Sequence, residues 1–82
     1  MAEPIKIIGE EFSLSTANTV GLATLVRVHN NSGGVVLITR KAGATTLGSA
    51  SMPNGSVEHF AKASDETLTA NAAVLACSIA YS

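Results

Sequence analysis

The sequence contains few charged residues. Of its 82 residues, 13% are Asp, Glu, Lys or Arg, against about 25% in ordinary soluble domains. The formal net charge is −1, and the five basic residues are scattered along the chain. Because no basic patch is present, we expect neither nucleic acid nor an anionic membrane surface as a partner.

Covalent and metal reinforcement are also scarce. The one cysteine, Cys77, excludes an intrachain disulfide. His29 and His59 lie far from Cys77 and from each other, without the paired spacing that zinc ligands show. One domain of this size cannot build a large core, so its stability needs another source. We predict no metal or cofactor, and association with other protein chains, including copies of itself.

Catalytic patterns are missing as well. The chain has a single aspartate, Asp65, and no Gly-x-Ser-x-Gly sequence. Gly33-Gly34 precede a strand-like run instead of a helix with a lysine, so no phosphate-binding loop is expected. Cys77 follows apolar residues, where a buried thiol is expected to be unreactive. We predict that the chain is not an enzyme.

Aromatic residues and long apolar runs are few. The aromatic residues Phe12, Phe60 and Tyr81 lie far apart, and there is no tryptophan, which argues against a stacking platform for single-stranded nucleic acid. The longest weakly polar run, Ala72–Tyr81, is too short for a membrane-spanning helix. The start of the chain, Met1–Pro4, has an acid where a signal peptide carries basic residues, so no targeting segment is expected.

Turn signals are frequent. Asn30–Gly34, Lys41–Ala44 and Pro53–Ser56 punctuate runs that are rich in β-branched residues. This spacing is typical of a sandwich or barrel. We predict an all-β fold, a small antiparallel β-sandwich or jelly-roll-like domain of about seven short strands that spans residues 1–82.

The middle of the chain predicts two strand pairs. Leu22–Asn30 alternates in polarity, and after the turn at Asn30–Gly34 the run Val35–Lys41 is expected to return as its hairpin partner. Thr45–Met52 is expected to be a strand of small residues. The Asn-Gly pair in the turn that follows favours the positive φ values of hairpins, and Ser56–Lys62 alternates again.

Both ends of the chain leave alternatives open. Ile5–Ile8 and Glu11–Leu14 predict two short strands broken at Gly9. Residues 1–8 are expected to form either an arm that adds to a neighbouring sheet or an edge strand of their own sheet. Near the C-terminus we predict a turn at Ser64–Thr67 and a final strand at Val74–Tyr81, with a helix as the alternative because apolar residues also recur at helical spacing.

The layout of the whole chain resembles small virion proteins encoded beside the capsid genes of marine tailed phages, including cyanophages. The stretches that carry the resemblance are Phe12–Val20 (FSLSTANTV), Ala23–Asn30 (ATLVRVHN), Met52–Glu58 (MPNGSVE), Lys62–Leu68 (KASDETL) and Ile79–Ser82 (IAYS). They are strand and turn signatures and include no catalytic motif.

The resemblance implies a capsid decoration, or cement, protein that binds where major capsid subunits meet and stabilises the head. Its partners would be the major capsid protein or other virion proteins, its oligomer a trimer, and its location the virion after synthesis in the host cytoplasm. It also implies an ion-pairing or capping role for Lys62 and Asp65. A tail, neck or head-fibre component and a stand-alone receptor- or carbohydrate-binding module are the alternatives. The interface is expected at Ile5, Ile7, Ile8, Asn30, Asn31, Pro53 and Asn54.

Overall fold

The computed structural model describes residues 4–81, and in this part of the chain every regular element is a strand. The strands are β1 (Ile5–Ile7), β2 (Phe12–Leu14), β3 (Leu25–His29), β4 (Val36–Ala42), β5 (Thr45–Met52), β6 (Val57–Ala61), β7 (Thr67–Ala70) and β8 (Val74–Tyr81). The predicted all-β, antiparallel sandwich is confirmed, with eight strands instead of about seven.

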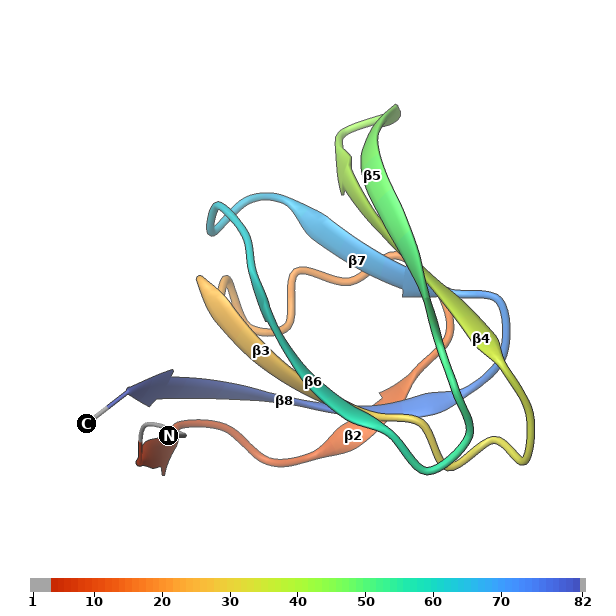
Figure 1. The fold of residues 1–82 in the computed structure, drawn as a ribbon. Helices are drawn as coiled ribbons and strands as arrows, with labels where there is room; N and C mark the ends of the chain where they lie inside the picture. Colours follow the sequence, from red (N-terminus) through yellow and green to blue (C-terminus); the bar gives the residue numbers. More distant parts are fainter. Residues whose placement is uncertain (1–3, 82) are drawn as a thin grey trace.

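The strands form two antiparallel sheets that pack against each other (Figure 1). The first sheet has five strands in the order β1-β8-β3-β6, with β2 also paired to β8. The second has three strands in the order β5-β4-β7. Strand β8 pairs with β1 and β2 on one side and with β3 on the other, so it holds the first sheet together.

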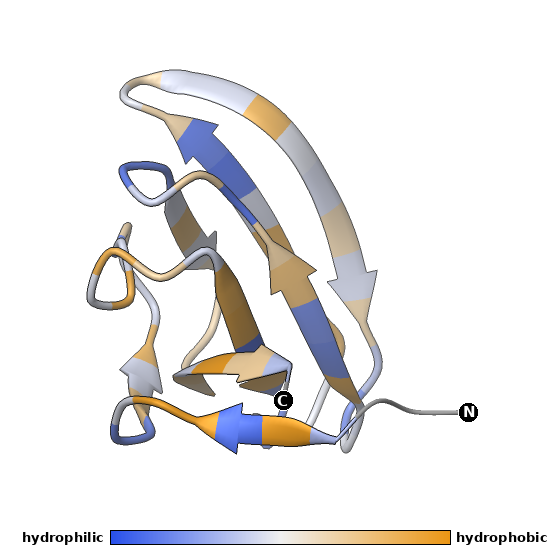
Figure 2. Ribbon diagram, turned by 90° about the vertical axis from the view of Figure 1, so that its left-hand side faces the viewer, coloured by the Kyte–Doolittle hydropathy of each residue, from blue (hydrophilic) through white to orange (hydrophobic). Residues whose placement is uncertain are grey.

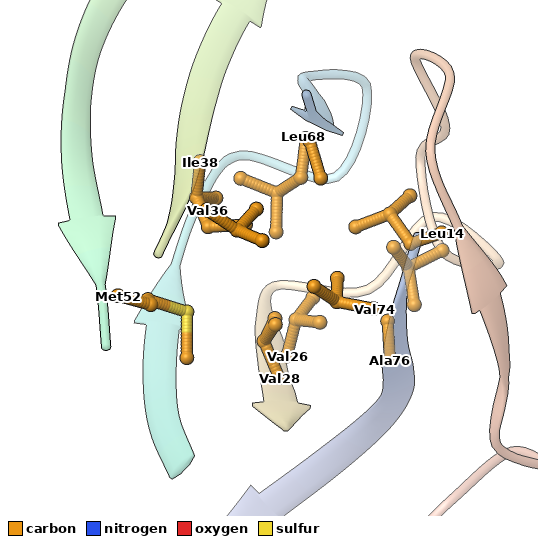
Figure 3. Packing of buried hydrophobic residues seen from close by; sticks show 11 residues of the cluster. Leu14, Val26, Val28, Val36, Ile38, Met52, Leu68, Val74 and Ala76 are labelled. Carbon is orange, nitrogen blue, oxygen red and sulfur yellow. The ribbon is translucent and has the colours of Figure 1, made fainter. Parts of the chain in front are cut away.

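The core lies between the inner faces of the two sheets (Figure 3). Period-two alternation directs Val26 and Val28 of the first sheet toward Val36 and Ile38 of the second. The cluster comprises Leu14, Val20, Val26, Val28, Val36, Ile38, Met52, Leu68, Ala70, Val74 and Ala76. Each of its large aliphatic side chains contributes roughly 1.5–3 kcal/mol through burial.

The predicted hairpin between Leu22–Asn30 and Val35–Lys41 is wrong. Both segments contain strands, but β3 pairs with β6 and β8 whereas β4 pairs with β5 and β7. The loop between them carries the chain from one sheet to the other. The true hairpin joins β4 to β5 at the predicted turn near Gly43, whose φ is 60°.

Asn30 explains why the chain changes sheets after β3. Its side chain is fully buried, and its amide nitrogen donates to the carbonyl oxygens of Gly34 and Met52 at 2.8 Å each. Its side-chain oxygen accepts from the Ser32 backbone N–H at 3.0 Å. The bond to Ser32 is a local Asx turn, whereas the bond to Met52 fixes the loop against the end of β5, and no local turn propensity encodes it.

The Pro53–Ser56 turn is confirmed, but it also joins strands of different sheets. The backbone N–H of Ser56 donates to the carbonyl oxygen of Pro53 at 3.1 Å, and Gly55 has a φ of 84°. Positive φ at the third residue alone is typical of a type II turn. The hairpin conformation expected for Asn54-Gly55 is therefore absent here.

The third strand begins later than predicted because the preceding residues form a left-handed turn. Val20, Gly21 and Leu22 have φ values of 56°, 65° and 60°. This conformation is costly for residues other than glycine. The Val20 side chain is buried in the core, which compensates for part of its cost.

The ends of the chain behave mostly as predicted. The strands β1 and β2 are separated at Gly9, and β1 is an edge strand of its own sheet. The C-terminal strand at Val74–Tyr81 is confirmed, and the helix alternative is wrong. The strand β7 was missed, since the sequence predicted only a turn up to Thr67.

Candidate interaction surfaces

The outer face of the first sheet is largely apolar. Because Ala76 faces the core, alternation along β8 directs Leu75, Cys77, Ile79 and Tyr81 away from it, although Cys77 and Ile79 are themselves buried. The pairing registers add residues from the neighbouring strands to the same face. We call this surface the outer apolar face; its members on other strands include Ile5, Ile7, Leu25, Val57 and Ala61.

Parts of the outer apolar face are strongly exposed. The exposed fraction is 72% for Ile7, 51% for Tyr81 and 41% for Val57. Strands with one wet face normally alternate between apolar and polar residues, whereas strands covered on both faces are apolar throughout. The composition of β8 is that of a strand covered on both faces, and on its outward-facing side Cys77 and Ile79 are only 5% and 4% exposed, whereas Tyr81 is 51% exposed.

The polar side chains on this face belong to Ser13, Arg27, His29 and His59. Arg27 lies 3.2 Å from the carboxylate of Glu11, and the His59 and Tyr81 rings are 6.2 Å apart. The ion pair is partly exposed, so it adds at most about 1 kcal/mol of stability. It does, however, cancel the charge of Arg27 on the face.

The outer face of the second sheet has a different composition. Val36 and Ile38 face the core, so Leu37 and Thr39 point outward, and the registers bring Ser49, Ser51 and Thr69 to the same side. Hydroxyl side chains hydrogen-bond water readily. This polar outer face is typical of a surface exposed to solvent.

The strand β5 ends the second sheet with an open edge. Only Met52 among its eight residues is buried, and the strand contains neither a charge nor a proline. In Figure 2 the outer strand of the β4–β5 hairpin is pale to orange along its length, whereas the end of its neighbour is blue. The blue end corresponds to Arg40-Lys41 of β4.

A half-open groove of about 210 Å³ lies between the two sheets beside β5. Its walls are mainly apolar, formed by Ile38, Ala50, Phe60 and Leu68. Arg40 also lines it and lies 3.4 Å from the Glu66 carboxylate. The groove accepts an apolar side chain more readily than a polar substrate.

A second hollow of about 190 Å³ lies beside Gly9, Phe12 and Val20. A Cβ atom at Gly9 would lie 2.6 Å from the Ser78 hydroxyl oxygen, so a larger residue would require that hydroxyl to rotate away. The hollow is shallow and carries no group of catalytic residues.

The seven residues predicted for an interface fall into two groups at opposite ends of the first sheet. Ile5, Ile7 and Ile8 lie on or after β1, beside the end of β8. The two loops at the other end are brought together by a hydrogen bond of 3.0 Å from the Gly33 N–H to the Asn54 side chain.

The four loop residues divide further by exposure. Asn31, Pro53 and Asn54 are exposed, so they remain candidates for a contact. Asn30 is fully buried and has no side-chain surface to offer a partner.

Lys62 has a structural environment that the sequence only partly predicted. Its side chain is 5% exposed, and its amine donates to the carbonyl oxygens of Ala23, Ala63 and Ser64 at 2.6, 3.3 and 3.4 Å. An ion pair with Asp65, one of the two roles expected for this pair, is absent from the described contacts, and the Lys62 amine binds backbone carbonyl oxygens instead. Burial lowers the pKa of the Lys62 amine, and the carboxylates of Glu66 and Asp65 offset part of that effect.

Groups suited to catalysis or metal binding do not converge. Within residues 4–81, no three side chains among His, Cys, Asp and Glu lie close enough to hold a metal ion. Cys77 is buried and free, and its nearest polar neighbours are backbone carbonyl oxygens. In the same part of the chain no helix has the length and apolarity of a bilayer span.

Comparisons of the chain with protein-family models, with curated proteins and with solved structures give no match. Functional inference accordingly depends on the surfaces described above and on the resemblance of the sequence.

Sequence reasoning missed the two surfaces that the fold makes prominent. The signal for the outer apolar face was the apolar character of Val74–Tyr81, where both alternating sets of residues are apolar except for Ser78. The signal for the open edge was the complete absence of charge from Thr45–Met52. Neither signal identifies a surface until the position of each strand in its sheet is known.

Proposed function

We propose that this chain is a structural protein of a bacteriophage particle, a decoration protein that binds where major capsid subunits meet and stabilises the head. The observation that supports the proposal most directly is the contrast between the two outer faces. The outer apolar face suits burial against the shell, while the hydroxyl-rich face of the second sheet suits exposure to solvent.

The mechanism follows from mass action. A protein that binds only the assembled shell shifts the equilibrium toward that shell, by about 2.7 kcal/mol per site at a free concentration 100 times its Kd. Many identical weak sites on one lattice add their effects through avidity. Such a role needs an uncharged contact surface and no catalytic group.

A binding experiment with phage particles stripped of this chain tests the proposal. Purified wild-type protein is expected to sediment with the particles, and Ile7→Asp is expected to reduce binding at least 10-fold by placing a charge on the outer apolar face. Val35→Asp is the matched control, because Val35 has nearly the same exposed fraction, 70% against 72%, and precedes β4 of the opposite sheet.

Four outcomes would contradict the proposal. Particles that never contain the chain would exclude a virion role. Equal loss of binding for Ile7→Asp and Val35→Asp would remove the outer apolar face as the contact. A low copy number per particle, as for a single ring of subunits, instead of one that matches the many sites of the capsid lattice would indicate a tail, neck or head-fibre component. A positive glycan array, with no particle binding, would favour the carbohydrate-binding alternative.

A further inference from the structure

The open edge of β5 has backbone groups with no partner in the described chain. The N–H of Leu37 bonds to the side chain of Asn71 at 3.0 Å, and its carbonyl oxygen accepts from the Asn71 N–H at 3.3 Å. The backbone N–H and C=O groups of Leu37 thus point toward β7. Because these groups alternate in direction along a strand of an antiparallel sheet, those of Val36 and Ile38 point toward β5. The backbone groups of their partners on β5, Met52 and Ala50, therefore point toward β4 and bond to it.

The residues of β5 on either side of Ala50 direct their backbone groups away from the sheet. By the same alternation, the N–H and C=O groups of Ser49 and Ser51 point away from β4. Within residues 4–81 neither residue has another backbone partner. The register shift near Arg40/Lys41 leaves one extra residue, Leu47, on β5, so the regular edge runs from Gly48 to Met52.

This edge lacks the features that usually prevent strand pairing. Natural edge strands are commonly blocked by charges, prolines or covering segments. The bulge at Leu47 shortens the edge, but the five residues beyond it have no such feature. The apolar groove bordered by Ala50 and Phe60 opens beside the same residues and would also be covered by an added strand.

We propose that β5 pairs antiparallel with β5 of a second copy, about a twofold axis at Ala50. Ser49 of each copy then lies opposite Ser51 of the other, and their outward N–H and C=O groups bond reciprocally. The two three-stranded sheets become one continuous sheet of six strands in the order β7-β4-β5-β5-β4-β7.

The chemistry of β5 favours a second copy as the occupant. The strand carries no charge, so two identical strands meet without like-charge repulsion. At the axis, the non-hydrogen-bonded Ala50 pair brings Cα atoms to about 4.5 Å, a spacing that suits small side chains. The edge strands of the first sheet, β1 and β6, carry Lys6 and Glu58 and are less suited to pairing with themselves.

A twofold contact of this kind closes on itself and gives a dimer, in contrast to the trimer that the resemblance implies. Two edge strands bury less than the roughly 1,600 Å² of a standard interface. We therefore expect a dissociation constant in the micromolar range. The contact concerns the isolated chain and does not depend on a role in a virion.

Sedimentation of the purified chain tests the dimer. Ser49→Pro removes one outward N–H without breaking a bond to β4, and it is expected to weaken dimerisation at least 10-fold while the circular dichroism spectrum stays unchanged. Ser49→Thr keeps the N–H and is the matched control, expected to dimerise as the wild type does. A monomer over the whole micromolar range, a trimer, or a dimer unaffected by Ser49→Pro would overturn the proposal.

Disulfide trapping tests the register and does not depend on the proline variant folding. In a Cys77→Ala background, Ala50→Cys is expected to form a covalent dimer when oxidised by diamide. Gly48→Cys is the control, since the twofold at Ala50 separates the two Gly48 positions by about 13 Å along the strands, beyond disulfide reach. Cross-linking of Gly48→Cys as readily as Ala50→Cys, or of neither, would contradict the proposed pairing.

Discussion

The two sheets of this sandwich contribute alike to the core and differently to the surface. Inward, both present aliphatic side chains that are almost completely buried, such as Val28 and Ile38. Outward, the first sheet presents isoleucine, leucine and tyrosine, whereas the second presents threonine and serine. The difference teaches that the inner faces determine the fold, while the outer faces indicate which side of the molecule a partner covers.

The largest expected effect tests whether the two inner faces act as one core. Leu14 and Leu68 lie in different parts of the sandwich, on β2 and β7, and each is 1% exposed. We expect Leu14→Ala and Leu68→Ala each to lower the free energy of unfolding by about 3 kcal/mol through lost burial and a residual cavity. Urea denaturation should show one cooperative transition for both. A separate transition in either variant would show that the sheets unfold independently.

A somewhat smaller effect is expected at the connection between the sheets. Asn30→Ala removes the side chain that bonds Gly34, Met52 and Ser32, and it should cost about 2 kcal/mol because buried carbonyl oxygens lose their donors. Asn31→Ala, at an exposed neighbouring position, is the control and should change stability by less than about 0.5 kcal/mol. Similar thermal melting of the two variants would argue against a structural role for the Asn30 amide.

Lys62→Met should lower stability by about 1–2 kcal/mol at neutral pH, because three carbonyl oxygens lose a charged donor while the apolar stem is kept. Since desolvation lowers the pKa of Lys62 in the folded state, the unfolded state binds more protons between that pKa and the ordinary value of 10.5. This group therefore makes the free energy of unfolding rise with pH across that window.

The variant should lack that rise, so the wild-type advantage over Lys62→Met should grow as the solution becomes alkaline. Denaturant midpoints measured for both proteins from neutral pH to about pH 10 provide the test. An advantage that shrinks with pH, or a more stable variant, would contradict the environment described for the amine.

The smallest expected change in stability concerns the outer faces themselves. Val57 and Leu37 lie on opposite outer faces and are 41% and 42% exposed. Val57→Thr and Leu37→Thr should each change stability by no more than about 0.5 kcal/mol. Only Val57→Thr should reduce binding of a hydrophobic dye, because only Val57 belongs to the outer apolar face. Equal reductions would erase the distinction between the faces.

Local pattern was sufficient to predict most strands. The strand at Thr45–Met52 was predicted as a run of small residues between turn signals and the strand at Val74–Tyr81 from its alternation, and the structure confirms both bounds. The strand Thr67–Ala70 was missed because it is short and follows a turn. On the side of β7 away from β4, the backbone N–H and C=O groups of Leu68 form reciprocal hydrogen bonds with those of Asn18. Asn18 lies about 50 residues earlier in the sequence, so no local signal identifies it as the partner.

Pairing and surface roles were much harder to predict. The hairpin assigned to Leu22–Lys41 was wrong because the buried amide of Asn30, a tertiary feature, directs the chain to the other sheet. The predicted interface favoured loops and the N-terminal strand, because exposed turns are where sequence suggests contacts. The outer apolar face became visible only when the registers placed Ile7, Val57 and Tyr81 on one side of one sheet.

The central position of β8 also constrains how the chain can be made. The first strand to leave the ribosome, β1, completes its ladder only with the last, and β2 and β3 need the same partner. Until the C-terminal residues emerge, most of the five-stranded sheet lacks its organising strand. Folding is thus expected to wait for the synthesis of β8 and to be slow, in the millisecond-to-second range of domains dominated by distant contacts.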